Sequence, residues 1–543
     1  MKTTLATAAA LLAASLSLAQ AQNRALLLPG QNLAGAGTIT DVGEFAMNSH
    51  GSWVGLVQTD LPTPTGYAVL VRDGQPVFLP DGVTLGPGFS VSANTLGLDD
   101  VGNVVYTAFD PATGDWHLMR NTTTVVKRGD LVDVDNDGVA EPVTGFRAVH
   151  LAKDGSGALY AVLGAEGDLH LLRLLRTDAG ALEIQVVLTP GHVLPTGGTV
   201  SEFDIQSLRY RSQLASNAAG DLAFALQFKG VFQYSLAGGT LATVVKQGDP
   251  SPFANFDWDI DLYQSVALSD AGDVYFPSEL AGNGQSLDVL AANQQALLFE
   301  GQPLKFPSGQ AVGHIYPSRS VRVSAKGEVL WAGLFKNAAG TVRPGLARDG
   351  KVVVLAGTTR VEGHLIDVVS LSQDGGHNFT ADGERILFRG RTAAGDVGLF
   401  EVRTTPTVEV IAGCVPKLAT LLPGFGSTTG LALGEFFQPI LQLTQAQSME
   451  AVPLLFVSPL GTGGCGTLVP GIGEVLISLQ PELLVVSAPS AKFGDTAFFA
   501  LPTLPQTLAV QGLAIHAQGL WLDAASPFEF ARLSNAMRYV VGL

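Results

Sequence analysis

Apolar residues recur at every second position in short runs along most of the chain. In "DLAFALQF", apolar side chains stand at alternate positions from Leu222 to Phe228, with small or polar residues between them. A period of two is typical of β-strands, and no repeat keeps a helical period. The small partners Ala223 and Ala225 suit closely packed sheets. The pattern predicts an all-β protein.

These runs belong to a repeat in which small polar residues lead into a glycine and a strand follows. The glycines are spaced by 51 to 65 residues, at Gly51, Gly102, Gly155, Gly220, Gly272, Gly327 and Gly383. Glycine accepts a positive φ in the turn between two strands without steric cost. Because the glycine serves a turn, its recurrence is evidence about the fold and not about catalysis.

Further strand signals in each unit predict four antiparallel strands. An aliphatic strand ends in glycine, as in "TVVKQGD", and Asp73-Gly74 and Asp349-Gly350 are hairpin signals. One such sheet cannot bury both faces, whereas seven around an axis can, so we predict a seven-bladed β-propeller over residues 22–413. An open stack of sheets, or six blades with an insertion, is the alternative. Either "ALLLPGQ" near the N-terminus or "VEVIAG" from Val408 could fill the outer place of the last blade.

The phrase that begins at Asn217 resembles the tandem NxxGxxAF repeat of secreted bacterial surface proteins. Asn217, Gly220, Ala223 and Phe224 match every fixed position, whereas the copy at 99–106 keeps only the glycine. The resemblance covers about residues 24–413 and implies a propeller-like fold and a surface location. It implies no activity.

The N-terminus has the features of a secretory signal peptide. Lys2 is positively charged, 5–18 is a short apolar run, and 19–21 (Ala-Gln-Ala) fits a cleavage site. The run is shorter than the ~20 residues that a membrane-spanning helix needs. We predict that residues 1–21 are a signal peptide and that the mature protein is secreted, periplasmic or on the cell surface, with no transmembrane segment.

Charge excludes one class of partner. The 543 residues include 48 acidic and 31 basic side chains, a formal net charge of −17. Nucleic-acid binding requires a basic surface, so we expect no nucleic-acid partner. Only 15% of the residues are charged, against roughly 25% in typical domains, which fits strands buried on both faces.

The segment "DVDNDGVAE" is a candidate metal loop. It offers hard oxygen ligands from Asp133, Asp135, Asp137, the Val139 carbonyl and Glu141. Such ligands suit Ca²⁺, and without a cation the carboxylates would repel one another. The loop is shorter than an EF-hand loop and resembles the D-x-D-x-D-G-x-x-[D/E] loops of calcium-binding β-propeller repeats. We predict a structural Ca²⁺ here, with a solvated acidic turn as the alternative.

The last part of the chain carries no copy of the repeat. Strand-like runs separated by Pro and Gly predict a small β-sandwich over residues 414–543. Its ending loosely resembles a C-terminal module of exported bacterial proteins, which implies sorting or attachment. The two cysteines, Cys414 and Cys465, predict one disulfide, because an even count in an exported protein indicates pairing.

Catalytic motifs are missing from the sequence. It contains no G-x-S-x-G, H-E-x-x-H or G-x-x-x-x-G-K-[ST] pattern. The nine histidines are scattered. His150, His314 and His364 lie near blade starts and could face the channel, but we interpret each as an isolated loop or core residue. The sequence therefore predicts no catalytic residue.

The sequence leaves two functions open. The first is a non-enzymatic binding protein, whose propeller recognises an extracellular protein or carbohydrate and whose C-terminal domain attaches or sorts it. The alternative is an extracellular polysaccharide-active enzyme, a glycoside hydrolase or lyase, with its site at the mouth of the propeller channel. The residues that line the channel distinguish the two.

Overall fold

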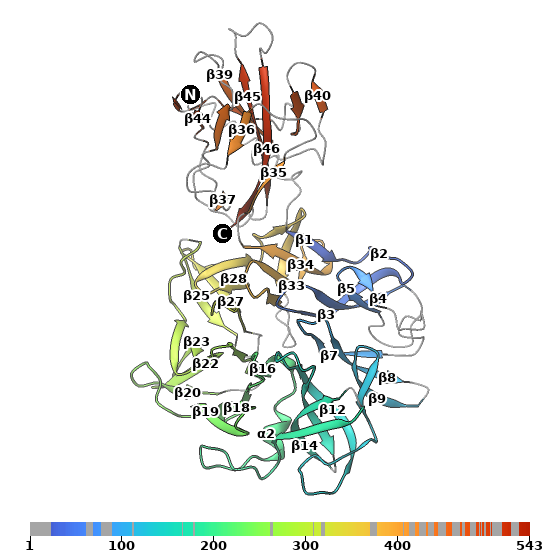
Figure 1. Cartoon of the computed structure of the whole chain (residues 1–543). Coiled ribbons are helices and arrows are strands. Elements are labelled where there is room, and N and C mark those ends of the chain that lie inside the picture. The colour runs from blue at the N-terminus through green and yellow to red at the C-terminus, as the bar shows by residue number, and fades with distance from the viewer. Residues whose placement is uncertain are drawn as a thin grey trace. The chain divides into compact units, whose positions relative to one another are not determined.

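The computed structural model describes most of residues 23–542 (Figure 1). The description leaves out 1–22, 61–68, 78–89, 111–112, 166, 178–179, 261–263, 308, 317–320, 370–376, 405–406, 412–418, 423–430, 433–438, 444–451, 459–466, 470–472, 478–484, 488, 490, 494–495, 500, 502–512, 523–530 and 543. The chain divides into two compact units. One comprises Ala25–Gly357 and Leu365–Phe400, and the other comprises Met1–Arg24, Thr358–His364 and Glu401–Leu543.

Seven antiparallel sheets of four to six strands follow one another around a ring, from blue to orange in Figure 1. We call them blades one to seven. In strand order, blades one to three are β2(Asn32–Leu33)-β3(Gly37–Met47)-β4(Trp53–Thr59)-β5(Val69–Arg72)-β6(Gln75–Pro76), β7(Ser90–Leu98)-β8(Val104–Asp110)-β9(Asp115–Arg120)-β10(Thr123–Lys127), and β11(Leu131–Val132)-β12(Glu141–Leu151)-β13(Leu159–Ala165)-β14(Asp168–Arg176)-β15(Leu182–Leu188).

Blades four to six have the same order. They are β16(Leu214–Ser216)-β17(Leu222–Leu226)-β18(Gly230–Ser235)-β19(Thr240–Lys246), then β20(Asp257–Asp259) and β21(Ala267–Leu268) beside β22(Val274–Gly282)-β23(Gln285–Ala292)-β24(Gln295–Phe299), and β25(Gln310–Ile315) and β26(Arg322–Val323) beside β27(Val329–Asn337)-β28(Val342–Arg348)-β29(Lys351–Leu355). Helix α2 (Glu202–Gln206) and the 3-10 turn η1 (Arg211–Gln213) precede blade four. In the described part of the chain, no helix has the length and hydropathy to cross a membrane.

Blade seven is closed by the N-terminus. It contains β30(Arg360–Val361), β31(His364–Val369), β32(His377–Phe379), β33(Arg385–Thr392) and β34(Val397–Arg403), and β1(Arg24–Leu27) pairs with β34 at its outer edge. The competing segment "VEVIAG" forms most of β35(Thr407–Ile411), which instead pairs with β46(Ala531–Gly542) of the C-terminal unit. The predicted seven-bladed propeller is confirmed, and "ALLLPGQ" supplies its closing strand.

The alternating pattern is explained by packing against two different neighbours. In β17, the apolar positions of 222–226 pack in a buried cluster with Tyr160 of blade three. The intervening Ala223 and Ala225 pack in a separate cluster with Trp258 of blade five. Both faces of each blade are thus buried, which removes the need for charged outward positions.

The recurring phrase is a capped turn. The Asn217 side-chain oxygen accepts hydrogen bonds from the backbone of Ala219 at 3.1 Å and Asp221 at 2.9 Å, and Gly220 has φ +82°. Equivalent caps come from Asn48, Asp99, Ser269, Ser324 and Thr380. A polar first position therefore holds the turn, since it satisfies amides that no strand pairs.

Side chains from the preceding blade reach these turns. Arg72 donates to the Gly102 carbonyl at 3.0 Å, and Arg348 donates to the Gly383 carbonyl at 2.6 Å. The following residue of each hairpin, Asp73 or Asp349, has positive φ, as the turn signal predicts. The two Arg-Asp-Gly segments therefore join neighbouring blades.

Substituting Gly220 with Ala is expected to destabilise the propeller more than Gly30→Ala does. Both glycines have positive φ, but a Cβ at Gly220 would lie 2.5 Å from Leu236 and 3.0 Å from Asp154, whereas one at Gly30 meets nothing within 4 Å. Overpacking typically costs about 1–3 kcal/mol beyond the shared backbone strain. Urea unfolding of the two variants measures this difference. Equal destabilisation would show that the turn does not pack against its neighbour.

The C-terminal unit is also built of strands. Its main sheet follows the order β42(Val485–Ser487), β39(Val452–Ser458), β45(Ala514–Leu522), β46, β36(Ala419–Leu422), β38(Ile440–Leu443), β44(Thr496–Phe498), β43(Ala491–Phe493), and β35 and β37(Leu431–Ala432) also pair with β46. A second sheet holds β40(Thr467–Val469) and β41(Gly473–Val475). The all-β prediction is confirmed here too. The boundary at 413/414 and the Cys414–Cys465 pair lie outside the described residues and stay predictions.

Candidate functional site: the axial mouth

The inner strands of all seven blades end at one cavity of about 280 Å³, which we call the axial mouth. Residues at two places of the repeat line it. The residues five before each turn glycine are Ala46, Gly97, His150, Ala215, Ala267, Arg322 and Asn378, and the residues two before it are Ser49, Asp100, Lys153, Ala218, Asp270, Ala325 and Ala381. The mouth is therefore two stacked rings, one residue per blade in each.

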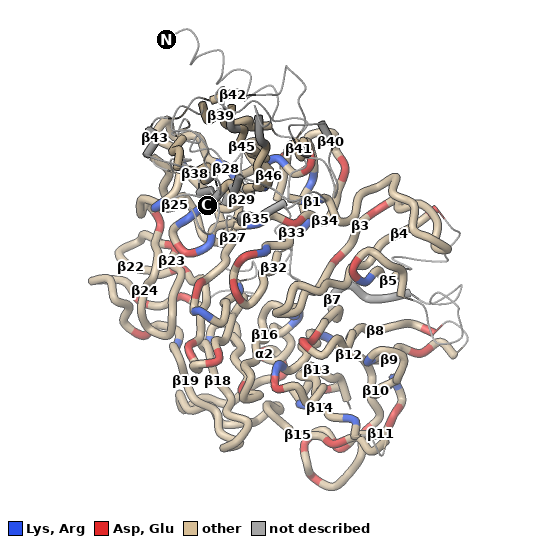
Figure 2. Tube along the Cα trace, turned by 45° about the horizontal axis from the view of Figure 1, so that its top comes forward, with Lys and Arg blue, Asp and Glu red and all other residues tan. Residues whose placement is uncertain are grey.

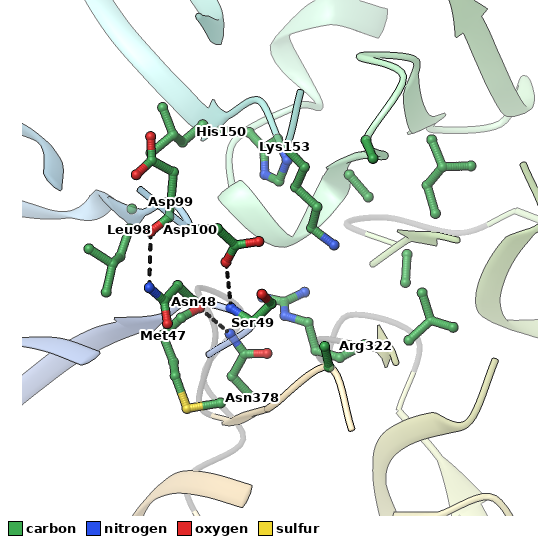
Figure 3. Close-up of a pocket in the computed structure, with 18 of the residues that line it drawn as sticks. Met47, Asn48, Ser49, Leu98, Asp99, Asp100, His150, Lys153, Arg322 and Asn378 are labelled. Carbon is green, nitrogen blue, oxygen red and sulfur yellow. Dashed lines mark hydrogen bonds between the residues drawn. The ribbon is translucent and has the colours of Figure 1, made fainter. Parts of the chain in front are cut away.

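Most ring positions are small, and the exceptions include three cationic or potentially cationic side chains. Lys153 and Arg322 extend into the open centre from blades three and six, with His150 beside Lys153 (Figure 3). Arg211 of η1 also lines the mouth, and it donates to the Phe45 carbonyl of blade one at 3.2 Å. In an acidic protein, these side chains concentrate positive charge at one point.

His150 is held in a defined state by blade four. The Ser216 backbone N–H donates to its Nε2 at 3.1 Å, and the Ser216 hydroxyl lies 2.9 Å from the same atom. Burial, followed by the charges of Lys153, Arg322 and Arg211, lowers the pKa of His150 well below its ordinary value. The imidazole is therefore neutral at neutral pH and accepts at Nε2.

The two central cations repel each other within the mouth. Lys153 is accessible from the channel but surrounded by protein, so burial lowers its pKa first and Arg322 lowers it further, while Asp270 and Asp100 partly oppose this. Burial and Arg211 lower the pKa of Arg322 to about 9, which leaves it protonated at neutral pH. An anion placed between them would relieve this repulsion.

The carboxylates near these two cations accept hydrogen bonds from backbone amides instead. Asp100 accepts from the Ser49 amide at 2.7 Å (Figure 3), and Asp270 accepts from the Ala218 amide at 3.0 Å. Among the described residues, no carboxylate oxygen lies within 4 Å of the Lys153 ammonium or the Arg322 guanidinium. The charge of these two cations is therefore available to a ligand, and the mouth is suited to an anionic group.

The structure brings together three of the five predicted metal ligands. Oxygens of Asp133, Asp135 and Glu141 lie within 4.8 Å of one another, just after β11 in the chain. Figure 2 shows acidic residues in red near this strand. Glu141 is 5% exposed, and Asp133 Oδ1 is buried without a hydrogen-bond partner. Asp137 accepts from the Val139 amide at 2.7 Å. The unpartnered Asp133 oxygen and the buried Glu141 carboxylate fit a bound cation, so this cluster could hold a metal.

Chelation of divalent metal is expected to lower the melting temperature of the wild-type protein. A cation bound only to the folded state stabilises it, by about 2.7 kcal/mol at a concentration one hundredfold above Kd. Glu141→Gln should remove the response to Ca²⁺, whereas the exposed, charge-matched control Glu183→Gln should keep it. Calorimetric melting with Ca²⁺ and with chelator measures this. A wild-type protein indifferent to both would contradict the metal site.

The sequence alone predicts that His150 is an isolated loop or core residue, and it does not single out Lys153 or Arg322. His150 faces the mouth, whereas His314 and His364 do not line it. His314 instead contacts the Asp288 carboxylate, which accepts from the Ile315 amide at 3.2 Å. The missed signal is positional, because a ring position of the repeat that departs from small residues identifies a side chain in the channel.

Comparisons with known proteins add little to this geometry. No family model and no curated protein matches the chain. Among solved structures, an oligogalacturonate lyase in complex with manganese matches at 12% identity over 71% of this chain and 98% of that chain, TM-score 0.37. An oligogalacturonate lyase from Vibrio parahaemolyticus matches at 12% over 68% and 98%, TM-score 0.25. MPT-4, a mannose phosphorylase from Leishmania mexicana in complex with phosphate ion, matches at 10% over 52% and 89%, TM-score 0.19. Similarity at this level defines neither a family nor an activity.

Proposed function

We propose that this is an exported protein whose axial mouth binds the carboxylate groups of an acidic polysaccharide. The observation that carries the proposal is that two cations, Lys153 and Arg322, line one mouth without a carboxylate partner within 4 Å in the described structure. A carboxylate between them gains charge-assisted hydrogen bonds and removes their mutual repulsion. The neutral His150 adds an imidazole to the same site.

The size of the mouth favours a sugar unit over a protein surface. Its volume of about 280 Å³ is near the lower end of small-molecule sites. One charged sugar unit can enter such a cavity, whereas a protein partner would have to insert a single side chain. A polysaccharide is also the ligand that an exported protein with a C-terminal attachment domain would meet outside the cell.

A second candidate function is eliminative cleavage of the same polysaccharide. The lowered pKa of Lys153 beside a guanidinium favours it, because an amine that loses its proton more readily than a solvated lysine can act as a base next to a group that neutralises a carboxylate. The amine would take the proton α to the uronate carboxylate, and the released electron pair would form the ring double bond. The glycosidic C–O bond at the carbon β to the carboxylate then breaks, and its oxygen takes the proton from the Lys153 ammonium, which restores the amine. Hydrolysis is less favoured, because it needs two free carboxylates and Asp100 and Asp270 are engaged.

We propose that the cluster at Asp133, Asp135 and Glu141 holds Ca²⁺, with Asp137 and the Val139 carbonyl completing its shell. The oxygen-only ligand set is the chemistry that supports this ion. Its role would be to order the loop that leads into β12. Glu141 begins this strand, whereas His150 lies near its other end. The ion takes no part in binding at the mouth.

A binding measurement tests the proposed function. Purified residues 22–543 are titrated with alginate, polygalacturonate and neutral dextran, and uronate samples are followed for the ultraviolet absorbance of an unsaturated product. Binding of the uronates but not dextran supports the mouth as an anion site. New absorbance that disappears in Lys153→Met adds the lyase activity. Equal binding of dextran, or binding unaffected by both Lys153→Met and Arg322→Met, would contradict the proposal.

The affinity for a uronate polymer is expected to fall as the pH rises. This fall should begin at a lower pH than the ordinary lysine pKa of 10.5 would give. Folding lowers the pKa of Lys153, so its ammonium is lost at a lower pH than that of a solvated lysine, and the uronate stays ionised throughout. Lys153→Arg keeps its charge and should remove this part of the fall. Titration calorimetry across pH measures both proteins. An unchanged pH profile in Lys153→Arg would show that Lys153 does not contact the anion.

A further inference from the structure

A second recess opens between blades four and five. It has a volume of about 630 Å³, and its lining includes Gln233, Thr243, Asp273, Tyr275, Asn293 and Gln294. The turn at residues 269–273 borders both this recess and the axial mouth. Ser269 and Asp270 line the mouth, and Asp273, at the end of the turn, lines the recess. The 269–273 turn therefore separates two openings that one chain-like ligand could reach together.

Two side chains of the recess leave hydrogen-bonding capacity unused. Thr243 Oγ1 is buried and has no hydrogen-bond partner. The side-chain amide of Gln233 reaches toward Gly272. Its Nε2 lies 3.8 Å from the position that a Cβ on Gly272 would occupy, and this side chain makes no hydrogen bond with a described residue. Buried polar groups are normally satisfied, so the unpartnered Thr243 hydroxyl, together with the half-buried Gln233 side chain, favours a polar occupant of this recess.

The remaining wall is fixed by the two blades. Asn293 donates to Asp273 at 2.9 Å and accepts from the Val274 amide at 3.0 Å. Gln294 donates across the blade junction to the Val244 carbonyl at 3.1 Å. Of the described residues that line the recess, Asp273 alone is charged, and none is cationic. The recess is therefore rigid, neutral to weakly acidic, and rich in amide and hydroxyl groups.

We propose that this recess binds a neutral sugar unit of the same polysaccharide whose acidic unit enters the axial mouth. The inference rests on the proposed function and narrows its ligand to a heteropolysaccharide that combines uronate with neutral sugars. Amide and hydroxyl groups pair with sugar hydroxyls, whereas the acidic Asp273 disfavours a second uronate here. A polymer of uronate alone would leave the recess unused.

Titrations with two kinds of oligosaccharide test the inference. One kind contains uronate alone (alginate, polygalacturonate), and the other combines uronate with neutral sugars (hyaluronate, gellan). The wild-type protein should bind at least one mixed oligosaccharide more tightly than any all-uronate one. The double variant Gln233→Ala/Thr243→Val should weaken that binding about tenfold, with all-uronate binding unchanged as evidence that it folds. Gln285→Ala, on an exposed position of β23 away from the recess, is the control.

The outcomes separate this inference from the proposed function. If all-uronate oligosaccharides bind as tightly as any mixed one, or if the double variant keeps the wild-type preference, the recess assignment is wrong while the mouth remains an anion site. If Arg322→Met leaves every affinity unchanged, the proposed function fails and the inference fails with it.

Discussion

Arg322→Met is expected to weaken binding of a uronate oligosaccharide by roughly 10- to 100-fold and, at the same time, to raise the melting temperature. The loss follows from removing a charge-assisted contact, worth about 1.5–3 kcal/mol. The gain in stability follows from the lowered pKa of Arg322. Folding disfavours its charged form, so the guanidinium destabilises the folded protein at every pH below about 9. Methionine keeps much of the side-chain volume and removes that penalty.

An exposed arginine provides the control for this experiment. Arg128→Met removes the same charge from the surface of blade two, where Arg128 is exposed and does not line the mouth. It should change neither the affinity nor the melting temperature appreciably. Calorimetric titration and thermal melting of the three proteins measure both quantities. An Arg322→Met protein that melts lower and binds normally would mean that this arginine serves the fold and not a ligand.

Leu27→Asp is expected to remove much of the stability of the propeller, because β1 closes its ring. Leu27 is 1% exposed and packs in one cluster with Phe45, Trp53 and Leu399. Truncating a buried leucine to alanine costs about 2–5 kcal/mol, and a buried unpaired carboxylate costs more. A stability of about 5–15 kcal/mol would be largely lost.

The neighbouring Arg24 gives a matched control on the same strand. Its side chain is exposed, so Arg24→Asp changes charge without entering the core and should unfold close to the wild-type urea concentration. Tryptophan fluorescence reports the transition, since Trp53 lies in the affected cluster. If Leu27→Asp unfolds like Arg24→Asp, then β1 does not close the ring.

The blades could be predicted because their signals are local. A period of two, a turn glycine and a capping polar residue all lie within about a dozen residues, and each follows from the backbone alone. The small alternate residues in β17 also revealed sheet-on-sheet packing, which the separate environments of Ala223 and Phe224 confirm.

The closing strand could not be assigned from the sequence, because two segments satisfy the same local rules. "ALLLPGQ" and "VEVIAG" are both short aliphatic strands before a turn, and a strand's own residues do not specify which edge it joins. The choice depends on β46, which pairs with β35 over Thr407 to Ile411. That pairing joins residues more than a hundred positions apart in the chain.

The axial mouth was missed for a related reason. Lys153 and Arg322 are separated by most of three blades, and only ring closure brings their charges together. Once the ring is known, the repeat itself identifies the lining positions, since they stand five and two residues before each turn glycine. The acidic loop at Asp133 was found easily, because its ligands are contiguous.

Titration calorimetry of the wild-type protein with an oligogalacturonate and with its methyl ester shows whether the axial mouth recognises the charge of its ligand. The two ligands share size and linkage, and the ester lacks the charge. We expect measurable binding of the acid that weakens with added salt, and little or no binding of the fully esterified form. Equal binding of both, or tighter binding of the ester, would contradict an anion site at the axial mouth.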